Sequence, residues 1–117
     1  MSRPFDIGGP ATALRLYLIL ICCAARGETV TYEELAQRAH QANKGLLTSP
    51  LDLVAAWCRA NGLPALTLLV VESMTGKPAP SVDATYNGNV APEQDKVREY
   101  DWFAIFPPSV AELTPAQ

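Results

Sequence analysis

The feature that most constrains this chain is an apolar run from Leu14 to Ala25, in which Arg15 is the only charged residue. Twelve residues are too few to cross a bilayer, which takes about 20. A helix that is apolar nearly all round is buried on most of its sides or paired with another copy of itself. We therefore expect a helix over residues 11–25, closed by Gly27, at the centre of the fold or at a homodimer interface.

The composition favours one globular domain rather than a disordered chain. With 117 residues, the chain is long enough to bury a core without disulfide bonds or structural metal ions. It is 49% apolar and 18% charged, which is too apolar for intrinsic disorder. We expect a single domain over residues 1–117, with an irregular arm at 1–10, a helix-helix-helix-hairpin core at 11–90, and a C-terminal helix and aromatic segment at 91–117.

Cysteine usage favours a cytoplasmic protein. The chain has three cysteines, Cys22, Cys23 and Cys58. All three have apolar neighbours, so we expect buried free thiols in a reducing compartment. A secretory signal peptide is the closest alternative, but Asp6 and a Gly-Gly-Pro break separate the basic N-terminus from the apolar run. We expect no membrane association.

Two further helices have clear start signals. Residues 31–34 (TYEE) match a capping box, in which a Thr side chain and a Glu three residues later satisfy free backbone N–H groups. This pattern predicts a helix from Tyr32 to about His40. Ser49 followed by Pro50 predicts a helix with Ser49 as its N-cap, and Asn61-Gly62 ends it.

The remaining segments predict a hairpin and a C-terminal cap over the core. Residues 66–72 (LTLLVVE) are typical of a strand, and we expect the chain to turn at Thr75-Gly76. Residues 79–91 are expected to form a loop or a loose hairpin, with a second turn at 87–88. We expect a helix over 92–100, an aromatic lid over 101–106 (DWFAIF) and a last capped turn at Ser109. The fold class is therefore α+β: a winged-helix-like bundle of three to four helices with a small antiparallel hairpin.

That order of elements suggests binding to double-stranded DNA, because the second helix of a helix-turn-helix pair enters the major groove. Residues 1–78 carry seven Lys/Arg against six Asp/Glu, whereas residues 79–117 carry two against six. The first two-thirds are thus weakly basic, although Asp52 would repel a phosphate backbone. Ordinary solvated charges are the alternative explanation. The candidate nucleic-acid-binding residues are Tyr32, Arg38, His40, Lys44, Thr48, Ser49, Arg59 and Lys77.

Residues 27–78 resemble the winged-helix half of the O6-alkylguanine DNA alkyltransferases and their alkyltransferase-like relatives. Residues 30–36 (VTYEELA) are similar to the T-Y-x-x-L-A helix start of that family, and residues 63–71 (LPALTLLVV), with Gly76 after them, occupy the place of its P-C-H-R-V-V or P-W-H-R-V-V strand and loop. This chain has Ala65 or its apolar neighbours where the family has its reactive Cys or Trp, and it lacks the His-Arg pair, so alkyl transfer by the family mechanism is excluded. The resemblance implies only the scaffold, with Tyr32 near a phosphate; the alternative is that Tyr32 packs on the first helix.

No catalytic, metal or cofactor site is expected. His40 is the only histidine, so a zinc ligand set cannot be assembled with buried thiols. Cys58 falls on the apolar stripe of its helix, where a thiol stays protonated and inert. No glycine loop has the surroundings that phosphate binding requires. We expect a non-enzymatic protein without a cofactor.

The aromatic residues near the C-terminus provide a second candidate surface. Bulky aromatic residues beside acids such as Glu99 and Asp101 make good interface anchors. A lid over the core is the alternative role. The second functional hypothesis is a small protein-protein interaction or inhibitor protein, whose partner-binding residues are Tyr100, Trp102, Phe103 and Phe106.

Overall fold

The computed structural model describes residues 9–86 and 89–114. Most of the arm expected at 1–10 and the turn expected at 87–88 lie outside the described residues. Within them the chain is mainly helical, with one pair of very short strands. The expected α+β class is consistent with this arrangement.

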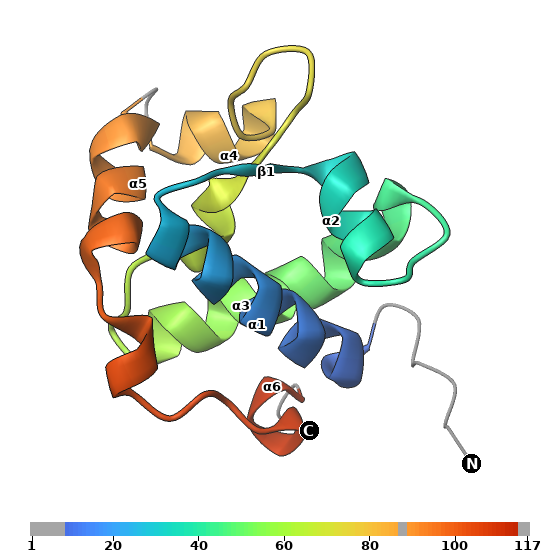
Figure 1. Ribbon diagram of the computed structural model, residues 1–117, viewed down its shortest axis with the longest axis vertical. Coiled ribbons are helices and arrows are strands. Elements are labelled where there is room, and N and C mark those ends of the chain that lie inside the picture. The colour runs from blue at the N-terminus through green and yellow to red at the C-terminus, as the bar shows by residue number, and fades with distance from the viewer. Residues whose placement is uncertain (1–8, 87–88, 115–117) are drawn as a thin grey trace.

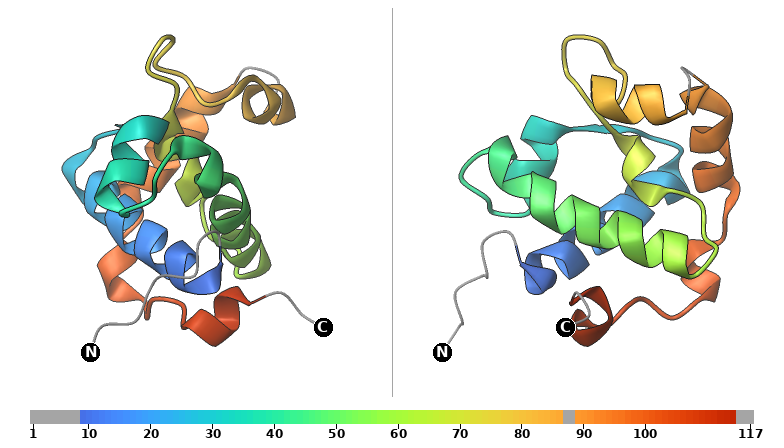
Figure 2. Two further views of the ribbon diagram at one scale, coloured as in Figure 1. Left: turned by 90° about the vertical axis from the view of Figure 1, so that its right-hand side faces the viewer. Right: turned by 180° about the vertical axis from the view of Figure 1, so that it is seen from behind.

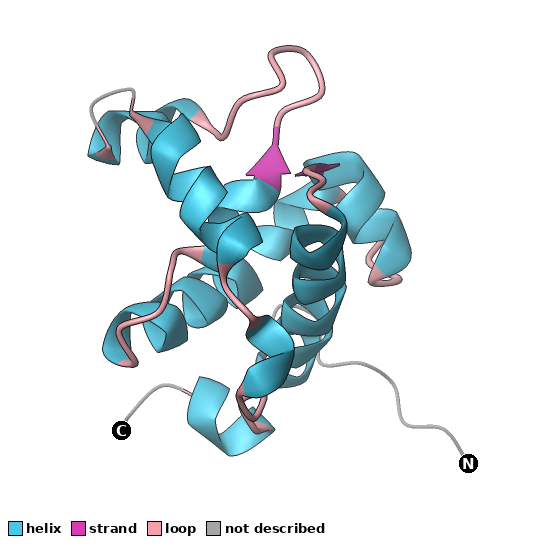
Figure 3. Cartoon of the chain, turned by 60° about the vertical axis from the view of Figure 1, so that its left-hand side comes forward, coloured by secondary structure: helices cyan, strands magenta, loops and turns pink. Residues whose placement is uncertain are grey.

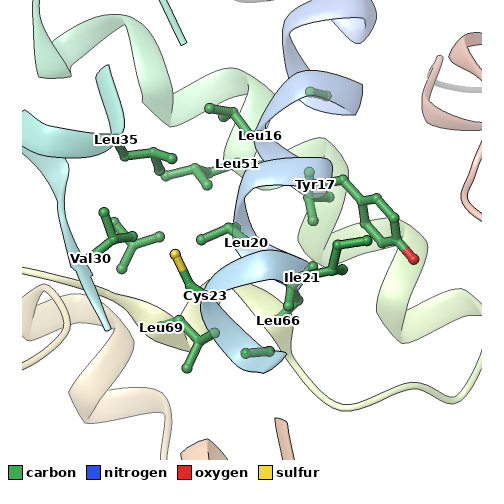
Figure 4. Close-up of a cluster of buried hydrophobic side chains, with 14 of the residues drawn as sticks. Leu16, Tyr17, Leu20, Ile21, Cys23, Val30, Leu35, Leu51, Leu66 and Leu69 are labelled. Carbon is green, nitrogen blue, oxygen red and sulfur yellow. The ribbon is translucent and has the colours of Figure 1, made fainter. Parts of the chain in front are cut away.

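Helix α1 (Pro10–Arg26) crosses the middle of the molecule, and α3 (Thr48–Ala60) runs behind it (Figure 1). The helix expected at 11–25 is thus confirmed, and Gly27 ends it in the left-handed conformation, with φ of 70°. Leu16, Tyr17 and Leu20 are fully buried. Figure 4 shows that the side chains of α1 leave the helix toward more than one side. The apolar run is therefore enclosed largely by its own chain.

The predicted pair of capped helices is confirmed, with one correction. Helix α2 (Tyr32–Arg38) begins after Thr31, whose side chain accepts a hydrogen bond from Glu34 N at 3.1 Å. A 3-10 helix, η1 (Lys44–Leu47), leads directly into α3. Because Thr48 is already helical, Ser49 is not the N-cap that we predicted. The capping side chain is Asn43, which accepts from Gly45 N at 2.9 Å at the start of η1.

The predicted antiparallel hairpin is wrong. The segment expected as one strand divides into a 3-10 helix, η2 (Leu66–Leu69), and a two-residue strand, β2 (Val70–Val71). Strand β2 pairs in parallel with β1 (Val30–Thr31), with Val30 opposite Val70. Figure 3 shows these two short strands in magenta among the helices. The chain after β2 makes a turn in which Glu72 N donates to Lys77 O at 2.8 Å, and it then starts a helix instead of a returning strand.

That helix, α4 (Pro80–Thr85), replaces the loop expected at 79–91. Pro80 stands at its first position, where a missing N–H costs nothing. Helix α5 (Val90–Glu99) confirms the helix expected at 92–100 and buries Val97 completely.

The C-terminal segment closes the core over α1 and α3. It comprises a 3-10 helix, η3 (Trp102–Ala104), and α6 (Val110–Leu113), which starts with the expected capping box at Ser109. Trp102 is buried and donates from Nε1 to Val97 O at 2.8 Å. The Tyr17 ring makes edge contacts with the Trp57 ring at 5.4 Å and the Trp102 ring at 6.2 Å between centroids. Three elements are thus joined by one aromatic cluster.

We predict that Trp57→Ala lowers the free energy of unfolding by about 3–5 kcal/mol, because it removes a large side chain from this cluster. Phe106→Ala, at a side chain that is 93% exposed, should change it by less than about 0.5 kcal/mol. Urea unfolding followed by far-ultraviolet circular dichroism measures both. Equal losses for the two variants would contradict the placement of Trp57 in the core.

Candidate functional site: a cleft beside helix α3

A cleft of about 810 Å³ lies between α3 and the segment that contains α4 and α5. Figure 2 shows α4 on one side of the strand pair and α3 on the other. Part of the lining comes from the chain between α3 and β2, namely Leu63, Pro64, Ala65 and Thr67. The cleft therefore lies where the chain passes from α3 through β2 to α4 and α5.

One side of the cleft is a single face of α3. Thr48, Asp52, Ala55 and Arg59 all line it, and their spacing of four, three and four residues places them above one another on a helix. Lys44 adds a second cation from η1. This side therefore offers a hydroxyl group, two cations and one carboxylate.

The other side is acidic and aromatic. Glu72, Tyr86 and Glu93 line the cleft from the chain after β2, from the end of α4 and from α5. With Asp52, three carboxylates face two cations, so the cleft has both signs of charge. A long polyanion would be attracted to the α3 side and repelled from the α5 side.

Tyr32 lines the same cleft and is half-buried. Burial raises the pKa of its hydroxyl group; a backbone hydrogen bond from Ala79 opposes this shift, and the charge of Glu72 adds to it. The phenol is therefore neutral at physiological pH and can both donate and accept a hydrogen bond. Its ring also packs against the core.

The Lys44 ammonium group already has an acidic neighbour. Its Nζ lies 3.1 Å from Glu33 Oε2, with both side chains exposed. The pKa of the Glu33 carboxyl is lowered, first by a hydrogen bond from its own backbone amide and then by Lys44. An exposed pair of this kind contributes little to stability, so Lys44 can exchange this partner for a ligand at small cost.

Of the eight residues predicted from the sequence to bind nucleic acid, the structure brings four to this cleft. These are Tyr32, Lys44, Thr48 and Arg59. Ser49 is exposed on the adjacent position of α3 but does not line the cleft. Sequence reasoning missed Glu72, Tyr86 and Glu93, because no local signal links them to α3.

The other three predicted residues lie elsewhere. Arg38 lies 3.3 Å from Glu34 and donates to Cys23 Sγ at 3.8 Å, on the side of α2 that meets α1. His40 is exposed just beyond α2, with a left-handed φ of 59°. Lys77 is exposed in the turn after β2.

The four predicted partner-binding residues divide into two pairs. Trp102 is buried and Tyr100 is half-buried, with their rings in edge contact at 4.8 Å between centroids. Phe103 and Phe106 are 64% and 93% exposed. The first pair therefore acts as the expected lid, and only the second pair is accessible to a partner.

The three cysteines also differ from one another. Cys23 and Cys58 are buried as expected, whereas Cys22 is exposed because consecutive helical residues point about 100° apart. Burial raises the pKa of the Cys58 thiol, opposed by a backbone hydrogen bond from Leu66. Burial also raises the pKa of Cys23, opposed by Arg38. Both buried thiols are therefore protonated and poor nucleophiles at neutral pH.

No protein-family model matches the chain, and neither the curated proteins nor the solved structures include a significant match. The resemblance to the alkyltransferases accordingly stays a prediction. Among residues 9–86 and 89–114, no helix has the length and hydrophobicity needed to cross a membrane. In the same part of the chain, no three His, Cys, Asp or Glu side chains gather as a metal-binding group.

We predict that Cys22 alone reacts rapidly with an aromatic disulfide reagent in the folded protein near pH 8. Cys23 and Cys58 should react only as fast as the core opens. Cys22→Ser should abolish the rapid phase, and Cys58→Ser should leave it unchanged. A rapid phase that is lost in Cys58→Ser would instead identify an activated thiol next to η2.

Proposed function

We propose that the chain is a non-catalytic nucleic-acid-binding protein that contacts double-stranded DNA through the α3 side of the cleft. The observation that supports this most is the convergence of Thr48 and Arg59 on one face of α3 with Lys44 from η1, next to the neutral hydroxyl group of Tyr32. Cations and hydroxyl groups are the side chains that bind phosphate oxygens. Helices α2 and α3 keep the order of a helix-turn-helix pair, without the antiparallel hairpin of a winged helix.

The acidic residues of the cleft limit the affinity. Asp52 lies one turn from Thr48 on the phosphate-binding face, and Glu72 and Glu93 lie across the cleft. Few phosphate contacts give weak binding that depends on salt. We therefore propose modest affinity, consistent with a regulatory role, in the cytoplasm, where the three free thiols remain reduced.

We predict that duplex affinity falls between about 50 mM and about 200 mM salt, and that Arg59→Ala reduces the slope of log K against log salt by about 0.9, the value of one phosphate contact. Asp52→Asn should strengthen binding, because it removes a repelling charge. Fluorescence anisotropy with a short labelled duplex measures both effects.

Arg26→Ala is the matched control, because it removes an equal charge at the exposed end of α1, outside the cleft. It should leave the salt slope unchanged. Binding that is absent at low salt, or that Arg26→Ala weakens as much as Arg59→Ala does, would overturn the proposal.

A second candidate function is protein binding through Phe103 and Phe106. Their exposure favours it, because large aromatic side chains are common interface anchors and are rarely left fully in water. The homodimer predicted through residues 11–25 belongs to this class. Most of the apolar surface of α1 is covered by its own chain, and Leu18, which is 45% exposed, is the most exposed of its large apolar side chains.

We predict that a photoreactive amino acid at position 106 forms a cross-link to a protein inside cells. The same amino acid at position 74 is an exposure-matched control, since Met74 and Phe106 are 94% and 93% exposed. Gel electrophoresis and mass spectrometry identify the adducts. Equal cross-linking at both positions would show that exposure alone explains the result.

A further inference from the structure

A shallow apolar groove of about 400 Å³ lies on the outer side of α1, away from the α3 cleft. Ala11, Leu14, Leu18 and Ile19 supply its apolar surface, and two guanidinium groups add positive charge. These belong to Arg15 and Arg38. Among the described residues no carboxylate lines this groove. Arg38 pairs with Glu34 beside it at 3.3 Å, and Arg15 also has a partner of its own, so an incoming carboxylate would add to these contacts.

The C-terminal segment carries the opposite combination of properties. Residues 99–113 contain Glu99, Asp101 and Glu112 and no Lys or Arg. Phe103 and Phe106 project from this segment and are largely exposed. The segment is therefore acidic and aromatic where the groove is basic and aliphatic.

The segment is also fixed at both ends. Trp102 before the exposed aromatic residues and Leu113 after them are each 2% exposed, within the core of their own chain. A segment that is anchored in this way loses little conformational freedom on binding, which favours association. The same anchoring holds Phe106 in solvent in its own chain, where it is 93% exposed, so only another molecule could cover it.

We propose that the acidic aromatic segment of one copy docks in the α1 groove of a second copy. Phe103 and Phe106 would cover Leu14, Leu18 and Ile19, and Asp101 would approach the guanidinium groups of the groove. When each copy both donates its segment and accepts the other's, the contact closes into a dimer. This differs from a symmetric contact of α1 with itself, and it does not depend on nucleic-acid binding.

Complementation between two defective variants tests this pairing. Leu18→Glu places a like charge in the groove that receives the acidic segment, and the double variant Phe103→Ser/Phe106→Ser removes the anchors. Each variant alone should sediment as a monomer at a concentration where the unchanged chain is dimeric. A concentration of about 0.5 mM is suitable, because interfaces below roughly 1,200 Å² are weak. An equimolar mixture should recover a heterodimer, since one intact segment still meets one intact groove.

The control variant is Met74→Ser, which removes another fully exposed apolar side chain and should dimerise like the unchanged chain. Because all altered side chains are at least 45% exposed, each variant should keep an unchanged melting temperature, which calorimetry checks. Three outcomes would overturn the proposal: an unchanged chain that is monomeric at this concentration, a dimer that persists without Phe103 and Phe106, or a mixture that stays monomeric. None of them bears on duplex binding, which is measured separately.

Discussion

The fold depends on covering most of α1 with the other elements, which leave one face with Ala11, Leu18 and Cys22 exposed. Leaving this many apolar side chains in water would cost free energy, so the other elements pack against most of the surface of the helix. Tyr17 shows how completely this happens: its side chain is fully buried, burial raises its pKa to about 12, and it touches aromatic rings from α3 and η3. Since α2, α3, α5, α6 and η2 all contact α1, the position of each follows from covering this one helix.

The helices could be predicted from the sequence because their signals are local. Thr31 and Gly27 act within a few residues of themselves, and each has the role that its position indicated. The prediction of Ser49 as an N-cap is wrong because Asn43, six residues earlier, already caps a helical turn. A backbone that is already helical has no N-cap at Ser49.

The sheet could not be predicted for the opposite reason. An apolar run as short as residues 66–72 is ambiguous between strand and helix, and its pairing partner, Val30–Thr31, lies about forty residues away. Nothing near Val70 indicates that partner. The turn at residues 72–77 is real, but a turn alone does not make a hairpin when Pro80 favours the start of a helix.

The candidate site shows the same division. Helix geometry places Thr48 and Arg59 on the same face of α3, so the α3 side of the cleft could be predicted from their spacing in the sequence. The acidic half depends on where α4 and α5 fold back after the strand pair, which is a tertiary property. The small net charge of residues 1–78 therefore gave no indication that the cleft carries both positive and negative side chains. The roles of the aromatic residues near the C-terminus could not be separated from the sequence either. Trp102 is buried, whereas the adjacent Phe103 is exposed.

The aromatic contacts of Tyr17 give this protein an intrinsic spectroscopic label. The chain has only two tryptophans, and both rings lie against the same tyrosine, one from α3 and one from η3. Excitation energy absorbed by Tyr17 can pass to either indole over these distances. If the C-terminal segment detached from the core, Trp102 would enter water and its fluorescence emission would shift to longer wavelength. Trp57 would lose a packing neighbour from the same segment. Ultraviolet emission therefore reports the docking of this segment without any added dye.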